Sequence, residues 1–135
     1  MTPGGTESVQ RGVLDTSVFI AKETGRPLMG LPDTAAVSVV TLAELHLGVL
    51  IAQSPAVRAR RLRTLTMVQS AFEPLPIDAE VARTFAELVA AARRDGKRPK
   101  IMDTWIAATA AAHDLPVYTQ DQDFAEIPEV RVHWV

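Results

Sequence analysis

Short apolar runs alternate along the chain with longer segments whose apolar residues recur at every third or fourth position. The short runs predict strands and the longer segments predict helices. We expect strands at residues 12–14, 36–40, 72–77, 115–119 and 130–134. We expect helices at residues 16–22, 41–53, 56–70, 78–94 and 101–113, with a helical turn at 121–125. This alternation predicts an α/β fold in which helices cover both faces of a parallel sheet.

Two of these predicted elements have unusual compositions. The segment 72–77 contains Pro74 and Pro76, which cannot donate a backbone hydrogen bond, so it fits only as a short strand or at a sheet edge. The segment 101–113 is rich in alanine and apolar on nearly every side. A helix of that kind lies in the interior of a protein, where its small side chains allow close packing against a sheet.

The length of 135 residues fits a single domain, and a hydrophobic content of 47% is sufficient for a core. Residues 1–10 are polar and contain glycine and proline, so we expect a flexible tail followed by one domain over residues 11–135. The sequence has no cysteine, which excludes disulfides and zinc–thiolate sites. No apolar run approaches the roughly 18 residues that span a bilayer, and no signal-peptide pattern is present. These features predict a cytoplasmic protein.

The formal net charge of −2 provides no general attraction to nucleic acids, so contacts of that kind need local basic patches. Two clusters of basic residues qualify. The first, at residues 58–63, is interpreted mainly as a solvated helix face. The second, at residues 93–100, includes Arg98 and Lys100 and leads directly to Asp103, so it could hold a phosphate backbone beside that acid.

Carboxylates follow several of the predicted strands or open the helices after them. Asp15 ends the first strand, Glu44 follows the second, and Asp103 lies in the first turn of the alanine-rich helix. Asp121 and Asp123 follow the fourth strand. Because the carboxyl ends of parallel strands share one edge of a sheet, we expect these acids to converge on one pocket.

Such a cluster predicts a metal site. Neighbouring carboxylates raise each other's pKa, and a hard divalent cation such as Mg²⁺ removes the repulsion and assists phosphoryl transfer. Structural interpretations stay open for single acids: Glu44 could complete a capping box with Thr41, and Asp103 or Asp121 could stabilise a helix start. Asp15, between two apolar runs, has no routine structural role.

The sequence resembles the PIN-domain ribonucleases, and in size and motifs it looks like the VapC-type toxins of bacterial toxin–antitoxin pairs. The matching segments occur in order and span nearly the whole chain. They are VLDTSVFI at 13–20, VSVVTLAELHLG at 37–48, DTWIAATA at 103–110 and VYTQDQDF at 117–124.

The resemblance implies a three-layer α/β/α sandwich with a five-stranded parallel sheet. It also implies an endoribonuclease toxin that requires Mg²⁺ or Mn²⁺ and is neutralised by a cognate antitoxin. Asp15, Glu44 and Asp103 match the first three acids of the family, and Asp121, with Asp123 behind it, matches the fourth. The helices within 41–70 resemble those that dock the antitoxin and support a homodimer.

The resulting hypothesis is hydrolysis of RNA phosphodiester bonds by a metal-activated water. Its catalytic residues are Asp15, Glu44, Asp103 and Asp121. Its metal ligands are the same four acids together with Asp123. Its candidate substrate-binding residues are Thr16, Ser17, Thr119, Arg98 and Lys100.

Two other functions are weighed against this hypothesis. A catalytically silent PIN fold could bind RNA or a protein through the arginine clusters, although the complete set of acids does not favour it. A phosphatase or phosphoacceptor domain also places an aspartate at the end of a strand. The haloacid-type phosphatase pattern needs a second aspartate where this chain has Ser17, and a receiver-like domain needs a lysine after its last strand that this chain lacks.

Overall fold

A parallel sheet forms the centre of the fold over residues 9–135, which the computed structural model describes. Its strand order is β2-β1-β3-β4. β1 (Arg11–Leu14) pairs with β2 (Thr34–Ala36) on one side and with β3 (Val117–Thr119) on the other, and β4 (Val132–Trp134) pairs with β3. All pairings are parallel, so the carboxyl ends of β1 and β3 lie side by side.

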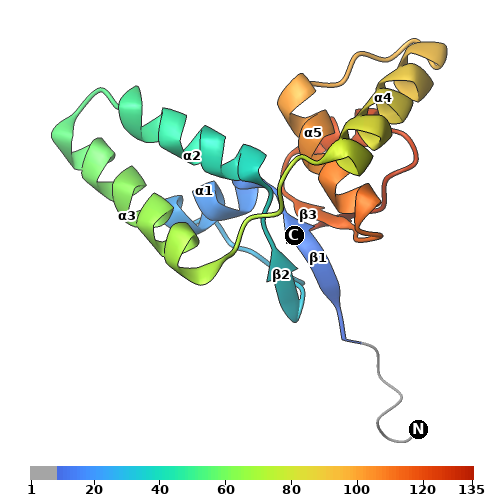
Figure 1. The fold of residues 1–135 in the computed structure, drawn as a ribbon. Coiled ribbons are helices and arrows are strands. Elements are labelled where there is room, and N and C mark those ends of the chain that lie inside the picture. The colour runs from blue at the N-terminus through green and yellow to red at the C-terminus, as the bar shows by residue number, and fades with distance from the viewer. Residues whose placement is uncertain (1–8) are drawn as a thin grey trace, which may run out of the picture.

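Helices cover both faces of this sheet (Figure 1). One layer consists of α1 (Thr16–Thr24), α2 (Val39–Leu50) and α3 (Pro55–Ala71). The opposite layer consists of α4 (Ala79–Arg94) and α5 (Ile101–Ala112). A 3-10 helix, η1 (Gln122–Glu126), connects β3 to β4. The predicted arrangement of helices on both faces of a parallel sheet is therefore confirmed.

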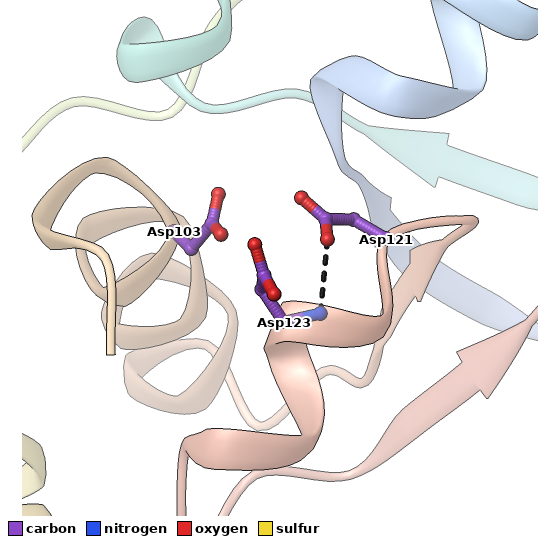
Figure 2. Close-up of side chains that lie close together, drawn as sticks. All are labelled: Asp103, Asp121 and Asp123. Carbon is purple, nitrogen blue, oxygen red and sulfur yellow. Dashed lines mark hydrogen bonds between the residues drawn. The ribbon is translucent and has the colours of Figure 1, made fainter. Parts of the chain in front are cut away.

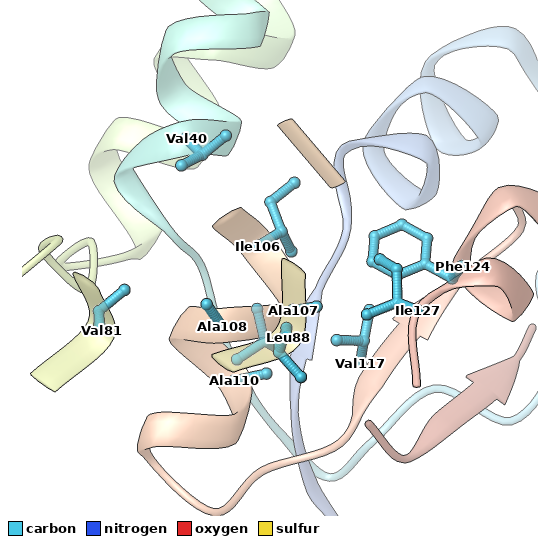
Figure 3. Close-up of a cluster of buried hydrophobic side chains, with 11 residues drawn as sticks. Val40, Val81, Leu88, Ile106, Ala107, Ala108, Ala110, Val117, Phe124 and Ile127 are labelled. Carbon is cyan, nitrogen blue, oxygen red and sulfur yellow. The ribbon is translucent and has the colours of Figure 1, made fainter. Parts of the chain in front are cut away.

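Two buried clusters flank the sheet because successive side chains of β1 point to opposite faces. Val13 belongs to the cluster under α4 and α5, which also contains Val117 and Phe124 (Figure 3). Leu14 belongs to the cluster under α1 and α3, together with Tyr118. Most of α5, including its central alanines, is buried, which confirms the interior position predicted for that helix.

The contact between β1 and β3 depends on a glycine. A Cβ atom at Gly12 would lie 2.2 Å from Cε1 of Tyr118, so the ring occupies space that any side chain would fill. The same ring stacks on His133 of β4, with 4.7 Å between the ring centroids. Gly12 therefore lets the Tyr118 ring lie across β1, β3 and β4.

The predicted strand over 72–77 is wrong, and over residues 9–135 the sheet has four strands rather than five. Within the described chain this segment forms one isolated parallel bridge, between Ser38 and Leu75. Pro74 and Pro76 flank Leu75 and lack the backbone N–H groups that a ladder needs. Leu75 exchanges backbone hydrogen bonds with the segment before α2, but its neighbours cannot extend the pairing.

The second strand ends and α2 begins earlier than the predicted strand at 36–40 allows. Ser38 caps α2, because its Oγ accepts a hydrogen bond of 3.0 Å from the backbone N–H of Val40. Thr41 therefore lies inside the helix rather than at its cap. The alternative interpretation of Thr41 and Glu44 as a capping box is wrong.

The other predicted elements are present, with ends shifted by a few residues. Asp78 caps α4 as expected, accepting a hydrogen bond of 2.9 Å from the Val81 backbone N–H. Of the predicted tail over residues 1–10, residues 1–8 lie outside the described part of the chain. None of the helices from residue 9 onward has the length and apolar character needed to cross a bilayer.

Candidate active site

Three carboxylates from neighbouring elements meet at the carboxyl edge of the sheet. Asp103 lies in the first turn of α5, Asp121 caps η1, and Asp123 lies in the first turn of η1. One oxygen of each lies within 4.8 Å of the other two, and Figure 2 shows the side chains pointing toward one another. The Asp123 backbone N–H donates a hydrogen bond of 2.9 Å to Asp121 Oδ1, which restricts the orientation of the Asp121 side chain.

Asp103 is the least satisfied of these acids. It is 6% exposed, and its Oδ2 is a buried oxygen without a hydrogen-bond partner among residues 9–135. Burial is the largest cause that raises its pKa, and the charges of Asp15, Asp121 and Glu44 add to it, giving a pKa of about 7. A buried carboxylate oxygen is energetically unfavourable when neither a hydrogen-bond donor nor a positive charge lies beside it.

Asp15 is held by donors from two elements. Its Oδ2 accepts a hydrogen bond of 2.8 Å from the Thr119 hydroxyl and one of 3.2 Å from the Ser17 backbone N–H. The second bond makes Asp15 the N-cap of α1, a structural role that sequence reasoning missed. Burial still raises the pKa of Asp15, although these hydrogen bonds oppose the shift.

The Thr119 hydroxyl joins Asp15 to the chain that carries Asp121. Its Oγ1 donates to Asp15, accepts a hydrogen bond of 2.9 Å from the Asp121 backbone N–H, and lies 3.1 Å from Ser17 Oγ. A hydroxyl has one proton, so Ser17 is the donor in the last pair. Ser17 Oγ also accepts from the Gln120 backbone N–H at 3.0 Å. The end of β3 is thereby locked to the start of α1.

Glu44 is oriented by a second hydroxyl. The Thr16 Oγ1 donates a hydrogen bond of 2.6 Å to Glu44 Oε1 and lies 3.0 Å from Thr41 Oγ1. Burial raises the pKa of Glu44, and the charges of Asp15 and Asp121 act in the same direction. Glu44 therefore shares an electrostatic environment with the other acids, although it is not one of the three that lie within 4.8 Å of one another.

The hydroxyl residues predicted to bind substrate lie behind the acids. Thr16 and Thr119 each donate to a carboxylate, and Ser17 bonds to Thr119. Thr119 is fully buried, which is at odds with direct contact between its side chain and a substrate. The signal in the sequence was the spacing Thr119-Gln120-Asp121, which allows a threonine hydroxyl to accept the N–H two residues later.

The two predicted basic residues occupy different places. Lys100 Nζ lies 2.6 Å from Asp123 Oδ2, and this hydrogen bond is the largest cause that raises the pKa of Lys100. Arg98 instead lines a pocket with Arg93 between the end of α4 and the start of α5. Asp123 is thus the acid of this cluster that forms an ion pair with Lys100 in the described chain.

The geometry fits a divalent cation of the magnesium type. Every candidate ligand is a carboxylate oxygen, which hard cations prefer over nitrogen or sulfur. Asp103, whose Oδ2 is buried and unpartnered, lies beside two further acids, so a cation held by these carboxylates would offset the repulsion among their charges.

Comparisons with known proteins agree with this geometry. A model of the PIN domain matches residues 12–130. Ribonuclease VapC5 of Mycobacterium tuberculosis is 52% identical over 118 residues, which cover 86% of this chain and 87% of that protein. Ribonuclease VapC4 of the same species is 48% identical over 130 residues, covering 93% and 97%.

A solved structure extends the likeness to the fold. The crystal structure of VapBC-5 from Mycobacterium tuberculosis, a member of the VapBC family of toxin–antitoxin systems, superposes with a TM-score of 0.80 and 47% identity. The match covers 93% of this chain and 97% of that chain. The chain therefore belongs to the PIN-domain family, as a VapC-type ribonuclease toxin.

Proposed function

We propose that this VapC-type protein cleaves RNA endonucleolytically in a reaction that requires Mg²⁺ or Mn²⁺. The observation that carries the proposal is Asp103, which has a buried Oδ2 without a partner and brings a carboxylate oxygen within 4.8 Å of oxygens of Asp121 and Asp123. Relatives named as ribonucleases cover nearly the whole chain, which supports the choice of RNA as the substrate class.

The acids divide into direct and supporting ligands in this proposal. Asp15 and Asp103 would bind the cation directly, Glu44 and Asp121 would bind it directly or through water, and Asp123 would stand behind them. When bound, Mg²⁺ polarises a phosphate and lowers the pKa of water, which promotes hydrolysis of a phosphodiester bond. Water would lose a proton and attack phosphorus in line with the departing ribose oxygen. The bond to that oxygen would break, and the oxygen would take up a proton to leave as a hydroxyl.

The chain's own contribution is the orientation of its carboxylates. The Thr119 hydroxyl and the Ser17 backbone N–H both bond to Asp15 Oδ2 and restrict the orientation of this carboxylate. The Thr16 hydroxyl restricts Glu44 in the same way, through Oε1. Because these partners are in place before any ligand arrives, the site needs little rearrangement to bind a cation and a phosphate. Lys100 adds a positive charge at the rim where the phosphate would enter.

Neutralisation by an antitoxin is supported by a groove beside the acids. A groove of about 340 Å³ between α1, α2 and α3 reaches from Ile51 to Thr16 and Glu44. Exposed apolar side chains, including Leu47 at 55%, border it. A protein segment lying in this groove would end at Glu44 and block the acids. Leu47→Glu should weaken inhibition by the cognate antitoxin at least about tenfold, whereas Met29→Glu, at an exposed residue outside the groove, should not.

The test is cleavage of total RNA by purified, antitoxin-free protein. Discrete fragments should form with Mg²⁺, and none should form with a chelator or with Asp103→Asn. Asp78→Asn is the matched control, because it removes one carboxylate but preserves a helix cap far from the acids. RNA binding that is equal with and without Mg²⁺, with no cleavage in any sample, would instead support the silent binding fold. Light scattering tests the homodimer that the family resemblance implies.

A further inference from the structure

We propose that the turn between α4 and α5 forms a binding site for the RNA backbone, separate from the acidic centre. The site is a pocket of about 230 Å³ lined by Val89, Arg93, Lys97, Arg98, Pro99 and Ile101. This inference rests on the proposed ribonuclease function for the identity of its ligand. It assigns a role to basic residues that the acidic chemistry does not use.

The charge of the pocket favours a polyanion. Its lining contains three cationic side chains and no acidic one. Lys97 forms a long ion pair of 4.0 Å with Glu126, in which both side chains are about half exposed. Arg93 and Arg98 have no ion-pair partner among the salt bridges of residues 9–135, so their guanidinium groups are available to phosphate oxygens.

The turn that carries these cations has a hydrogen-bonded backbone. The Lys97 N–H donates to Ala92 O at 2.8 Å and the Gly96 N–H donates to Arg93 O at 3.0 Å, the two bonds of a Schellman motif. Gly96 adopts a left-handed φ of 71°, which this motif requires and glycine adopts without strain. Pro99 further restricts the residue before it, Arg98. A turn built in this way loses little conformational entropy when a ligand binds.

The pocket lies close to the acids along the chain and in space. Arg98 and Ile101 flank Lys100, whose Nζ contacts Asp123 of the acidic centre. Asp103 follows Lys100 by less than one helical turn, about 5 Å of rise. An RNA strand with one phosphate at Asp103 therefore has neighbouring phosphates within reach of the pocket.

The residue types indicate contact with the backbone rather than with bases. The lining offers no aromatic side chain on which a base could stack. Arginine and lysine contacts to phosphates contribute affinity and register without reading sequence. The α4–α5 pocket should therefore raise affinity for RNA of any sequence and make that affinity dependent on salt.

The arginines of α3 provide a contrast and a control. Arg60 pairs with Glu23 at 3.2 Å and Arg61 donates to Gly48 O at 2.7 Å, so both are committed to internal contacts. Arg58 and Arg63 on the same helix are exposed and lie outside the α4–α5 pocket. Replacing them changes the net charge as much as replacing Arg93 and Arg98.

The experiment measures binding without cleavage. Protein carrying Asp103→Asn, in chelator, is titrated onto a labelled single-stranded RNA of about 12 nucleotides at several KCl concentrations between about 50 and 200 mM. Adding Arg93→Gln and Arg98→Gln should weaken binding about tenfold and reduce the slope of log K against log salt by about 1.4, the value for two single-strand phosphate contacts. The loss should be equal for two RNAs of unrelated sequence.

The control pair Arg58→Gln and Arg63→Gln should leave the slope unchanged. The proposal is overturned if the pocket variant keeps the slope of its parent, or if the control pair lowers the slope by the same amount. Because binding is measured without catalysis, a protein that binds RNA as expected but never cleaves it contradicts the ribonuclease proposal alone. Circular dichroism confirms that each variant is folded before its slope is compared.

Discussion

Two buried carboxylates at the same edge of the sheet have different surroundings. Asp15 is 3% exposed and accepts hydrogen bonds from the Thr119 hydroxyl and the Ser17 backbone. Asp103 is 6% exposed, yet its Oδ2 has no such partner in the described chain. Burial raises the pKa of both acids, and around Asp103 the charges of neighbouring acids raise it further.

This difference shows which carboxylate is stabilised by the protein itself and which one needs a ligand. A carboxylate with hydrogen-bond donors is oriented by the protein alone. A buried carboxylate oxygen without a donor is stabilised only when a proton or a cation occupies the space in front of it. Asp15 is therefore held in one orientation by the protein. Asp103 is the residue whose surroundings should change most when a cation binds.

The largest effect is expected from removing the Asp103 charge. Asp103→Asn should lower the rate of RNA cleavage by about 10³-fold or more, since it removes a charge that would hold the cation. The fold should be retained, because this carboxylate makes no hydrogen bond through Oδ2 that the amide would break. Initial rates on one defined RNA, compared with those of Asp78→Asn, measure the effect. A variant that cuts at the wild-type rate would remove Asp103 from the mechanism.

The next largest effect is expected from removing the Thr119 hydroxyl, which orients Asp15. Thr119→Val removes the hydroxyl that orients Asp15 but preserves shape, and it should lower activity about 10- to 100-fold, as loss of a group that orients a metal ligand commonly does. Thr119→Ser should restore most of the activity. Thr109→Val is the matched control, because that equally buried hydroxyl bonds only to the Trp105 carbonyl within α5. Equal losses in the two valine variants would mean that the effect is on folding.

The raised pKa of Asp103 predicts a smaller effect on stability. Its pKa is about 7 in the folded protein and 3.8 ordinarily, so between these values the folded state binds more protons than the unfolded chain. The free energy of unfolding should therefore rise as the pH falls from about 8 to about 5. Asp15 and Glu44 act in the same direction, since their pKa values are also raised.

Denaturant titrations of the metal-free protein measure this dependence. At about pH 8, Asp103→Asn should be more stable than the wild type by about 1–2 kcal/mol, a value that allows for partial solvent screening. Its stability should also change less with pH, whereas Asp78→Asn should follow the wild type. A wild-type protein that loses stability over this fall in pH would contradict the unpartnered state of Asp103.

The smallest effect concerns Lys100. Its ammonium group lies 2.6 Å from Asp123 Oδ2, where it opposes the approach of another cation. Lys100→Gln should therefore tighten Mn²⁺ binding by about threefold, a modest change because the pair is solvent-exposed. Lys97→Gln, at a lysine paired with Glu126 rather than with these acids, should leave the affinity unchanged. Weaker binding in Lys100→Gln would indicate that the lysine helps to assemble the acids.

Much of this site followed from periodicity and the rule for parallel sheets. Because β1 and β3 are parallel neighbours, Asp15 and Asp121 follow them at the same edge of the sheet. The prediction of a fifth strand was wrong because Pro74 and Pro76 prevent residues 72–77 from forming a ladder, although the segment is apolar. The start of α2 was misplaced because Ser38, which caps it, lies within a run that also has the composition of a strand.

The partners of each acid could not be predicted from the sequence. The bond between Thr119 and Asp15 joins residues 104 positions apart, and its existence depends on the register of β3 against β1. The missing partner of Asp103 is equally a property of packing, since it requires knowing every donor near one oxygen. Sequence patterns identified which residues have suitable chemistry, whereas the tertiary structure determined which donors their oxygens meet.

Calorimetric titration with Mn²⁺ tests most directly the claim that Asp103 awaits a cation. Wild-type protein and the Thr109→Val control should bind the ion with the same affinity, and Asp103→Asn should bind it at least about tenfold more weakly. Binding to the wild type near pH 7 should also release protons, because a carboxylate with a pKa of about 7 is partly protonated there. Equal affinity in Asp103→Asn, with no proton released from the wild type, would contradict this account of the site.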